Sequence, residues 1–286
     1  MELTGGLMMS QTTVAASDQK RFEPSYSPFW KGLGKWLGLS MLMLIYFPLI
    51  WLVLLSVSRD PLSGIPGDFS FQHYRALFAS SAWHMPLLAS VIIGLIVGAV
   101  CAVTATVIGR AVPRMSRPVP MLLVFVLPLF VPGMSMGAAI FIFSQSVLGL
   151  NLGFWSIALG HYVWGFPFAL LIVLVVTLRF DQTLIEAGRD IGASDWQVFR
   201  DIEFPLLMPG IFSAGLFGFL MSFNEVMRTI FLRGTSETLP VWNWVQAAAQ
   251  QSQVPIIFSL SSIVLILTLP LLSGVFWLLF VRLNKT

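Results

Sequence analysis

Long runs of apolar residues without a single charge decide what this chain can fold into. A helix that crosses about 30 Å of hydrocarbon needs roughly 20 apolar residues. Five charge-free runs are long enough to do so: Leu37–Val57, Met85–Gly109, Val119–Ser144, Leu152–Leu178 and Val254–Val281. Only 10% of the 286 residues are charged and 57% are hydrophobic, which is too little charge to cover a water-soluble body. The sequence therefore predicts an all-α integral membrane protein.

A sixth span is expected to begin at Leu206, although its apolar run is shorter than the others. Charge is absent only as far as Phe223, and three polar residues follow it: Asn224, Glu225 and Arg228. On one continuous helix Glu225 would lie about 28 Å beyond Leu206, near the outer edge of the hydrocarbon, with Arg228 on the same face. We interpret the segment as a sixth transmembrane helix with a polar outer end. A short re-entrant segment is the alternative.

Basic residues are divided unevenly between the two sides of these spans. The side that holds both termini has twelve: Lys20, Arg21, Lys31, Lys35, Arg110, Arg114, Arg117, Arg179, Arg189, Arg200, Arg282 and Lys285. The other side has four: Arg59, Arg75, Arg228 and Arg233. Because basic loops stay in the cytoplasm, both termini are predicted to be cytoplasmic. Residues 1–31 have no apolar core of the kind a signal peptide needs, so we expect a cytoplasmic tail over 1–31 and a transmembrane domain over 32–286.

Several classes of function are disfavoured by the composition. The net charge of +3 comes from residues in short loops and at the two ends, and no basic stripe indicates nucleic-acid binding. The one cysteine, Cys101, lies in an apolar run and cannot form an intrachain disulfide. The three histidines are scattered without the spacing of metal ligands, so no metal site is expected.

Residues 179–206 form a cytoplasmic loop whose local signals predict two short helices. Thr183-x-x-Glu186 has the pattern of a capping box that begins the first helix. Gly192 is suited to a left-handed C-terminal cap. Ser194-x-x-Gln197 is a second capping box, and the helix that it begins is expected to end before Pro205.

The same loop carries a large apolar content for a segment that faces water. Its larger apolar residues are Ile185, Ile191, Trp196, Val198, Phe199 and Ile202. An exposed apolar patch framed by charge usually marks a site for a partner. The alternative is that these side chains fold back onto the helical bundle.

The spacing of this loop resembles the signature of ABC importer permeases. That signature has Glu-Ala-Ala, three residues, Gly, nine residues and Ile-x-Leu-Pro. Here the corresponding residues are Glu186, Ala187, Gly188, Gly192, Ile202, Phe204 and Pro205. The chain departs from the signature at Gly188 and Phe204, and both departures keep the spacing and the small or apolar character. The loop lies before the last two spans, as in that family.

The resemblance implies a type I importer transmembrane domain with a permease core over 85–281 and a coupling loop over 179–206. The coupling loop would insert into a cytoplasmic ATP-binding subunit, with Trp196 and Phe199 among its contacts. Glu186 would hold it through local hydrogen bonds, and Gly192 would supply the turn. Two ATP-binding subunits, a second homologous permease and an external binding protein are the implied partners, in a bacterial inner membrane. ATP and Mg²⁺ would be bound by the partner ATPase, and this chain would be a transport subunit without a cofactor or enzymatic activity. It has no complete phosphate loop, because Gly34-Lys35 lacks both the upstream glycine and the following Ser or Thr.

Polar residues at membrane depth are candidates for a substrate pathway, because charge there is costly and rare. The candidates are Asn224, Glu225, Arg228, His161, Trp164, Ser259 and Ser262. A functional interpretation places Asn224 and Glu225 at the outer mouth of the pathway. The alternative is a local pair between Glu225 and Arg228, with the serines serving as packing contacts.

Three further segments resemble the spermidine/putrescine subgroup of these permeases. They are Ser222-Phe-Asn-Glu225, Phe231-Leu-Arg-Gly234 and Thr238-Leu-Pro240. Asn224 replaces an acid that is common in that subgroup, and Arg228 adds a positive charge nearby. The subgroup also includes importers of opines, aminophosphonates and similar zwitterions, so the implied substrate is a polyamine or a related small organic solute. A secondary, ion-coupled transporter is the alternative class, which would show inverted repeats and no ATPase-docking loop.

Overall fold

The structure is a computed structural model, and it describes residues 28–277, with side chains from residue 32 onward. The predicted tail therefore lies almost wholly outside the described residues. The chain divides into two units, Met1–Ile50 and Trp51–Thr286, and each is described by itself. The α-helices are α1 Pro28–Ser56, α2 Gln72–Ala79, α3 His84–Ala111, α4 Pro118–Val126, α5 Gly133–Ile142, α6 Phe154–Thr177, α7 Thr183–Asp190, α8 Asp195–Val198, α9 Phe204–Phe223, α10 Met227–Leu232, α11 Leu239–Ala249 and α12 Val254–Trp277.

Short 3₁₀ and π segments connect several of these helices. They are η1 Pro61–Ser63, η2 Val112–Arg114, η3 Leu127–Phe130, η4 Phe143–Val147, η5 Phe199–Glu203 and η6 Gln251–Gln253, of which η4 and η5 are π-helical. Between residues 28 and 277 the only extended pairing is an isolated bridge between Ser58 and Phe69. The predicted all-α class is confirmed.

Five continuous helical segments are long and apolar enough to cross a membrane. They are Gly32–Ser56, His84–Arg114, Phe154–Thr177, Asp195–Phe223 and Gln251–Trp277. A sixth candidate is the pair Pro118–Phe130 and Gly133–Val147, which is bent by 100°. The predicted six spans are therefore present when the bent pair is counted as one.

The predicted third span is not a single straight helix, and proline explains the bend. Val131 precedes Pro132 and is extended, with φ −90° and ψ 125°, because a residue before proline is disfavoured in the helical region. Pro132 then precedes the first residue of α5 and cannot donate a backbone hydrogen bond. The segment before the bend has 13 residues, about 20 Å of helix, which is short for a span of its own.

The span that the sequence places from Leu206 onward begins earlier in the structure and ends before the polar residues that were expected at its outer end. It is continuous from Asp195 to Phe223, and Asn224 ends it with φ −99° and ψ 4°. The Asn224 side-chain Nδ2 donates to the Leu220 carbonyl (2.9 Å) and so satisfies a carbonyl of the last turn. Glu225 lies beyond this end and Arg228 lies on the separate helix α10, so the expectation of one helix through both residues is wrong.

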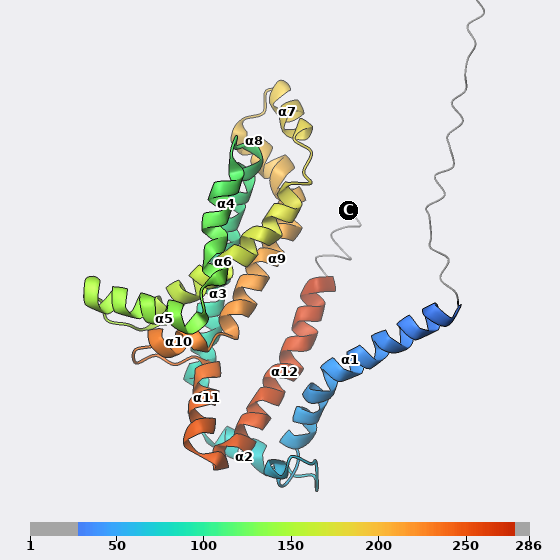
Figure 1. The fold of residues 1–286 in the computed structure, drawn as a ribbon, viewed down its shortest axis with the longest axis vertical. Coiled ribbons are helices and arrows are strands. Elements are labelled where there is room, and N and C mark those ends of the chain that lie inside the picture. The colour runs from blue at the N-terminus through green and yellow to red at the C-terminus, as the bar shows by residue number, and fades with distance from the viewer. Residues whose placement is uncertain (1–27, 278–286) are drawn as a thin grey trace, which may run out of the picture. The chain divides into compact units, whose positions relative to one another are not determined.

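Helices α3, α6 and α9 pack together at the centre of the unit Trp51–Thr286 (Figure 1). Glycine allows the close approach of α3 to α9: a Cβ atom on Gly98 would lie 2.6 Å from the Gly215 carbonyl oxygen. The absence of a side chain at Gly98 therefore lets the two backbones approach closely. Buried side chains between these helices include Ile93, Val97 and Leu170. A second apolar cluster joins α2, α11 and α12 through Leu77, Leu239, Trp242 and Leu260.

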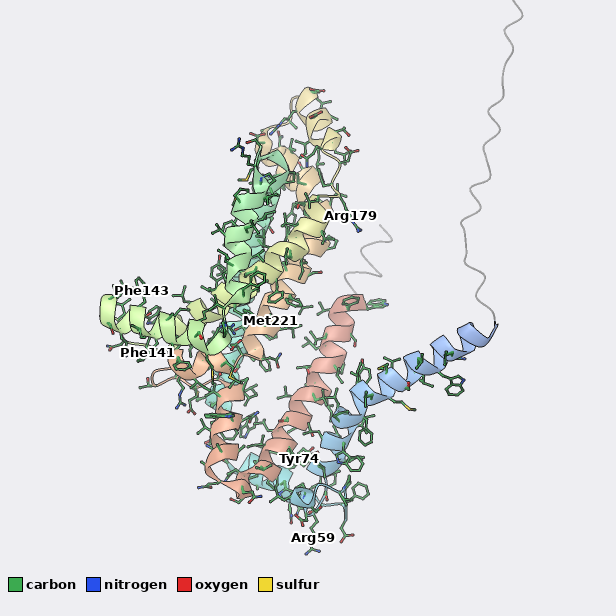
Figure 2. All side chains as sticks on the ribbon, viewed as in Figure 1. Arg59, Tyr74, Phe141, Phe143, Arg179 and Met221 are labelled. Atoms are coloured by element: carbon green, nitrogen blue, oxygen red, sulfur yellow. The ribbon has the colours of Figure 1, made fainter. Side chains whose placement is uncertain are left out.

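Residues that the sequence assigns to opposite sides of the membrane lie at opposite ends of this unit. Arg179 lies where α6 leads into the segment with α7 and α8, and Arg59 lies near α2 at the other end (Figure 2). The coupling loop at 179–206 therefore lies at the end of the unit far from α2 and α11 (Figure 1).

Candidate functional site

The coupling loop begins with a helix cap that differs from the predicted one. The Asp181 carboxylate oxygen Oδ1 accepts hydrogen bonds from the Thr183 backbone N–H (3.0 Å) and from Thr183 Oγ1 (2.8 Å). These two bonds stabilise the charged form and lower the pKa of Asp181. The predicted capping box at Thr183 and Glu186 is wrong, because Asp181 already satisfies the Thr183 donors. Glu186 is exposed, and its carboxylate forms none of the expected local hydrogen bonds within residues 28–277.

The turn at Gly192 is as predicted. Gly192 has φ +88°, in the left-handed region, and it follows Ile191, the C-cap residue of α7. The Gly192 N–H donates to the Arg189 carbonyl (2.9 Å) and the Ala193 N–H to the Gly188 carbonyl (3.1 Å). This pair of bonds is a Schellman motif, which satisfies the free carbonyls at a helix end. Gly192 therefore reverses the chain between α7 and α8.

The second capping box is confirmed, but the helix that it begins does not stop at Pro205. Gln197 N–H donates to Ser194 Oγ (3.3 Å), and Ser194 N–H donates to Gln197 Oε1 (2.8 Å). Helix α8 then passes through the π-turn η5 directly into α9. In the wider turn Phe204 N–H bonds to the Phe199 carbonyl, and Pro205 enters among the first residues of α9, where a missing N–H costs little.

The coupling loop packs part of its apolar content inward and leaves the rest exposed. Ile185 and Val198 are buried. Gly188 lies against Ile202, whose Cδ1 would be only 2.8 Å from a Cβ atom on Gly188, so this departure from the signature makes room for the isoleucine. In contrast, the side chains of Leu184, Ile191 and Trp196 are 44%, 86% and 64% exposed. Some of these side chains are thus packed away, as one alternative from the sequence expected, and others stay exposed, as a partner site would require.

A buried carboxylate fastens the start of α9 to the end of α3. Glu203 is 3% exposed, and it is bonded by Arg110 Nε and by Arg114 Nη2, the latter at 2.9 Å. The Arg110 guanidinium also lies 4.2 Å from the centre of the Phe199 ring, a cation–π contact. Sequence reasoning did not find this arrangement, because 93 and 89 residues separate the partners.

A second buried charge pair lies just beyond the other end of α9. Arg228 Nη1 donates to Glu225 Oε2 (2.7 Å), and the Arg228 backbone N–H donates to Glu225 Oε1 (3.1 Å). Both side chains are less than one tenth exposed. The guanidinium lies 4.0 Å from the centre of the Trp164 ring on α6, and Gly133 of α5 faces it from another side. The pair therefore joins α5, α6 and α10.

His161 extends this polar cluster inside the bundle. Its Nδ1 is 2.8 Å from Ser222 Oγ and its Nε2 is 2.7 Å from Thr229 Oγ1. Because Thr229 Oγ1 donates its proton to the Glu225 carbonyl (3.0 Å), it accepts from His161 Nε2. A neutral His161 then accepts at Nδ1 from Ser222, and every polar atom of the ring is satisfied. Ser222 and Thr229 were not among the predicted pathway residues.

The structure thus brings together His161, Trp164, Glu225 and Arg228, whereas Ser259 and Ser262 lie apart from them on α12. Asn224 is exposed beside the cluster. Ser259 and Ser262 are buried on α12, and Ser259 Oγ contacts the Ser56 and Pro255 carbonyls at 3.4 and 3.3 Å. Within residues 28–277 no group of three or more His, Cys, Asp or Glu residues is placed to hold a metal ion.

Comparison with known proteins gives one family and several relatives. The family described as "Binding-protein-dependent transport system inner membrane component" matches residues 90–282. The spermidine/putrescine transport system permease protein PotC of Haemophilus influenzae is 28% identical over 232 residues, 79% of this chain and 88% of the relative. PotC of Escherichia coli K12 is 32% identical over 126 residues, 43% of this chain and 46% of the relative.

A third relative and one solved structure extend the comparison. The putative 2-aminoethylphosphonate transport system permease protein PhnV of Salmonella typhimurium is 29% identical over 209 residues, 71% of this chain and 78% of the relative. A chain of a bacterial ABC transporter involved in the import of the acidic polysaccharide alginate superposes with a TM-score of 0.66 at 16% identity, covering 88% of this chain and 99% of that chain. At that identity the likeness shows a shared fold.

Proposed function

The chain belongs to the family of binding-protein-dependent transport system inner membrane components, and we propose that this ABC importer permease carries a small organic amine across the bacterial inner membrane. In this proposal an external binding protein delivers the solute. A second, homologous permease completes the pathway, and two copies of an ATP-binding subunit supply ATP hydrolysis with Mg²⁺. This chain itself binds no cofactor and catalyses no reaction.

The exposed apolar side chains of the coupling loop are the observation that carries the proposal. Leu184, Ile191 and Trp196 are all exposed beside the exposed Glu186, within the segment that has the spacing of the family signature. Removing such side chains from water favours association by about 25 cal/mol per Å² of apolar surface. We propose that the loop docks into a groove on the ATP-binding subunit on the cytoplasmic side, and that both termini lie on that side, as the distribution of basic residues predicts.

The relatives suggest the chemical class of the solute. Two of them are named for spermidine and putrescine, and another for 2-aminoethylphosphonate, and all three solutes contain an amino group. Both carboxylate oxygens of Glu225 are already bonded to Arg228, so this residue does not offer the unpaired negative charge that would select a polycation. We therefore propose that the solute is a small organic amine, either a polyamine or an aminophosphonate.

Affinity purification from membranes in mild detergent tests the proposal. We expect an ATP-binding subunit and a second permease to co-purify and to be identified by mass spectrometry. Ile191→Ser should lower the recovery of the ATP-binding subunit, whereas Ile65→Ser, at an exposed isoleucine outside the loop, should not. Recovery of the chain alone, with transport that survives ATP depletion, would instead indicate an ion-coupled secondary transporter.

A further inference from the structure

We propose that Glu203 is a positioning residue for transport, and that its two arginine partners make the coupling loop and the transmembrane helices move as one body. The inference rests on the proposed function, because it concerns how movement of the docked loop reaches the pathway. We call Glu203, Arg110 and Arg114 the arginine–glutamate clamp.

Within residues 28–277 the clamp provides the only ion pairs between the segments that it joins. Glu203 belongs to η5, between the coupling loop and α9, whereas Arg110 is near the end of α3 and Arg114 is in η2. Each arginine binds a different oxygen of the carboxylate, Arg110 to Oε2 and Arg114 to Oε1. A carboxylate that accepts from two guanidinium groups is fixed in orientation as well as in position.

Local backbone geometry directs Glu203 inward. The segment Phe199–Glu203 is a π-turn, and π-turns inside α-helices are frequent at functional sites. The neighbouring Asp201 is exposed and paired only with the adjacent Arg200, at 2.7 Å. In the same turn Glu203 is 3% exposed, and Phe199 lies under the Arg110 guanidinium. The turn therefore presents two of its side chains to α3.

Four parts of the chain meet at the clamp. A small cavity beside it is lined by residues of all four parts. They are Arg110, Pro113 and Arg114 at or after the end of α3, Thr177 at the end of α6, Phe180, Gln182, Ile185 and Glu203 of the coupling loop, and Leu207 of α9. Without the charges, only apolar and van der Waals contacts would hold the loop against α3 and α6 here. A charge that is buried and paired resists sliding, because separation leaves it unpaired in a medium of low polarity.

The clamp gives a physical path from the docking surface to the bundle. Coupling between distant sites requires an element whose two states both sites bias. If the coupling loop could shift without α3, bending at the π-turn η5 between α8 and α9 would absorb its displacement. With Glu203 held by α3, the loop, α9 and α3 share one displacement, and α3 packs closely on α6 (Figure 1).

Three variants in the complete complex test this inference. Glu203→Gln keeps the shape of the side chain and removes its charge. Arg114→Gln removes the more exposed of the two arginines, and Arg114→Lys restores its charge. Glu237→Gln is the matched control, since it removes the acid of another glutamate–arginine pair that lies outside the coupling loop. Each complex is reconstituted in lipid vesicles, and ATP hydrolysis is measured together with uptake of labelled spermidine or 2-aminoethylphosphonate, whichever the wild-type complex imports.

A second readout follows movement without depending on the solute. In a Cys101→Ala background, Asn224→Cys places a single thiol at the exposed outer end of α9. Its labelling rate is compared with and without ATP. A purely local structural role for Glu203 would not remove an ATP-dependent change about 30 Å away along the helix.

We expect Glu203→Gln to co-purify with the ATP-binding subunit and to hydrolyse ATP, while the solute imported per ATP falls by at least about fivefold, the lower end of typical coupling between sites. The ATP-dependent change at residue 224 should disappear. Arg114→Gln should show a smaller loss that Arg114→Lys restores, and Glu237→Gln should behave as wild type. The inference would be overturned if Glu203→Gln and Arg114→Gln both import solute per ATP within about twofold of wild type. It would also be overturned if both variants lost the ATP-binding subunit. A wild-type chain that neither binds that subunit nor requires ATP would overturn the proposed function and the inference with it.

Discussion

Removing one partner of the buried Glu225–Arg228 pair should destabilise the protein more than removing both. Glu225→Gln leaves the Arg228 guanidinium buried between Trp164 and Gly133 without its counter-ion. The glutamine Oε1 can still accept from the Arg228 backbone N–H, as Glu225 Oε1 does at 3.1 Å, so the start of α10 keeps its cap. The substitution therefore removes the charge and the hydrogen bond from Arg228 Nη1 while keeping the bond from the backbone N–H.

The expected magnitude follows from burial. The two side chains are 4% and 9% exposed, and breaking a buried pair by removal of one partner costs about 3–5 kcal/mol. For a domain of this size about 1 kcal/mol shifts the melting temperature by roughly 2–4 °C, so Glu225→Gln should lower it by about 6–20 °C. Adding Arg228→Met removes the stranded charge and should recover most of the loss, because neutral replacement of a buried pair is often close to neutral in stability.

The single cysteine provides the assay. Cys101 is the only cysteine in the chain and is fully buried, so a thiol-reactive fluorogenic dye labels it only when the bundle opens. Apparent melting temperatures are compared at one scan rate, because unfolding of such proteins is seldom reversible. Glu237→Gln is the matched control: Glu237 also pairs with an arginine, Arg233, but both side chains are about one third exposed, and such pairs contribute about 0–1 kcal/mol.

Two results would refute this reasoning. If Glu225→Gln melts within about 2 °C of Glu237→Gln, the buried charge is not stranded by loss of its partner. If the double variant melts no higher than Glu225→Gln alone, the loss comes from Glu225 itself and not from an unpaired Arg228.

Three further predictions concern the backbone, the helix cap and helix packing. Gly192→Ala places a side chain at φ +88°, costing roughly 1–2 kcal/mol, and should reduce recovery of the ATP-binding subunit in the pull-down; equal recovery would contradict a role for this turn. Asp181 has a lowered pKa in the folded state, so its cap stabilises α7 fully above the ordinary aspartate pKa of 3.8 and is lost as pH falls through the folded-state pKa. Amide exchange in residues 183–190, corrected for the intrinsic rate, should therefore increase on acidification in wild type and should not change with pH in Asp181→Asn. Gly98→Ala would bring its Cβ to 2.6 Å from the Gly215 carbonyl and should destabilise the α3–α9 contact by about 1–3 kcal/mol; a melting temperature equal to wild type in the Cys101 assay would show that the helices separate without cost.

The sequence predicted the spans well because membrane insertion depends on the composition of each segment. A charge-free run of about 20 residues is a local property; four of the five such runs form continuous helices here, and so does the shorter run that begins at Leu206. The sequence did not predict the 100° bend near Pro132 or the end of the helix at Asn224, because these depend on more than local composition. Proline and asparagine are tolerated inside transmembrane helices when neighbours satisfy the freed backbone groups, and a sequence alone does not reveal those neighbours.

The candidate site likewise has features that the sequence predicted and features that it did not. Gly192 and the Ser194–Gln197 cap were predictable, because left-handed caps and capping boxes depend on residues within a few positions. The clamp at Glu203 and the bonds of His161 to Ser222 and Thr229 depend on contacts across 61 to 93 residues. Ser259 and Ser262 looked equivalent to His161 as intramembrane polar residues, but α12 packs on α2 and α11 instead.

The two buried charge clusters lie just beyond opposite ends of one uncharged helix. Glu203 precedes α9 and is held by α3, while Glu225 follows α9 and is held by Arg228 of α10. Between them α9 has 20 residues without charge, about 30 Å of helix. The hydrophobic effect that buries such an apolar helix is not directional. Charged hydrogen bonds are directional, so the two clusters fix α9 to its neighbours at both ends. A displacement applied at the coupling loop would then reach Glu225 and Arg228 through the rigid helix, and through Arg228 it would reach Trp164 of α6.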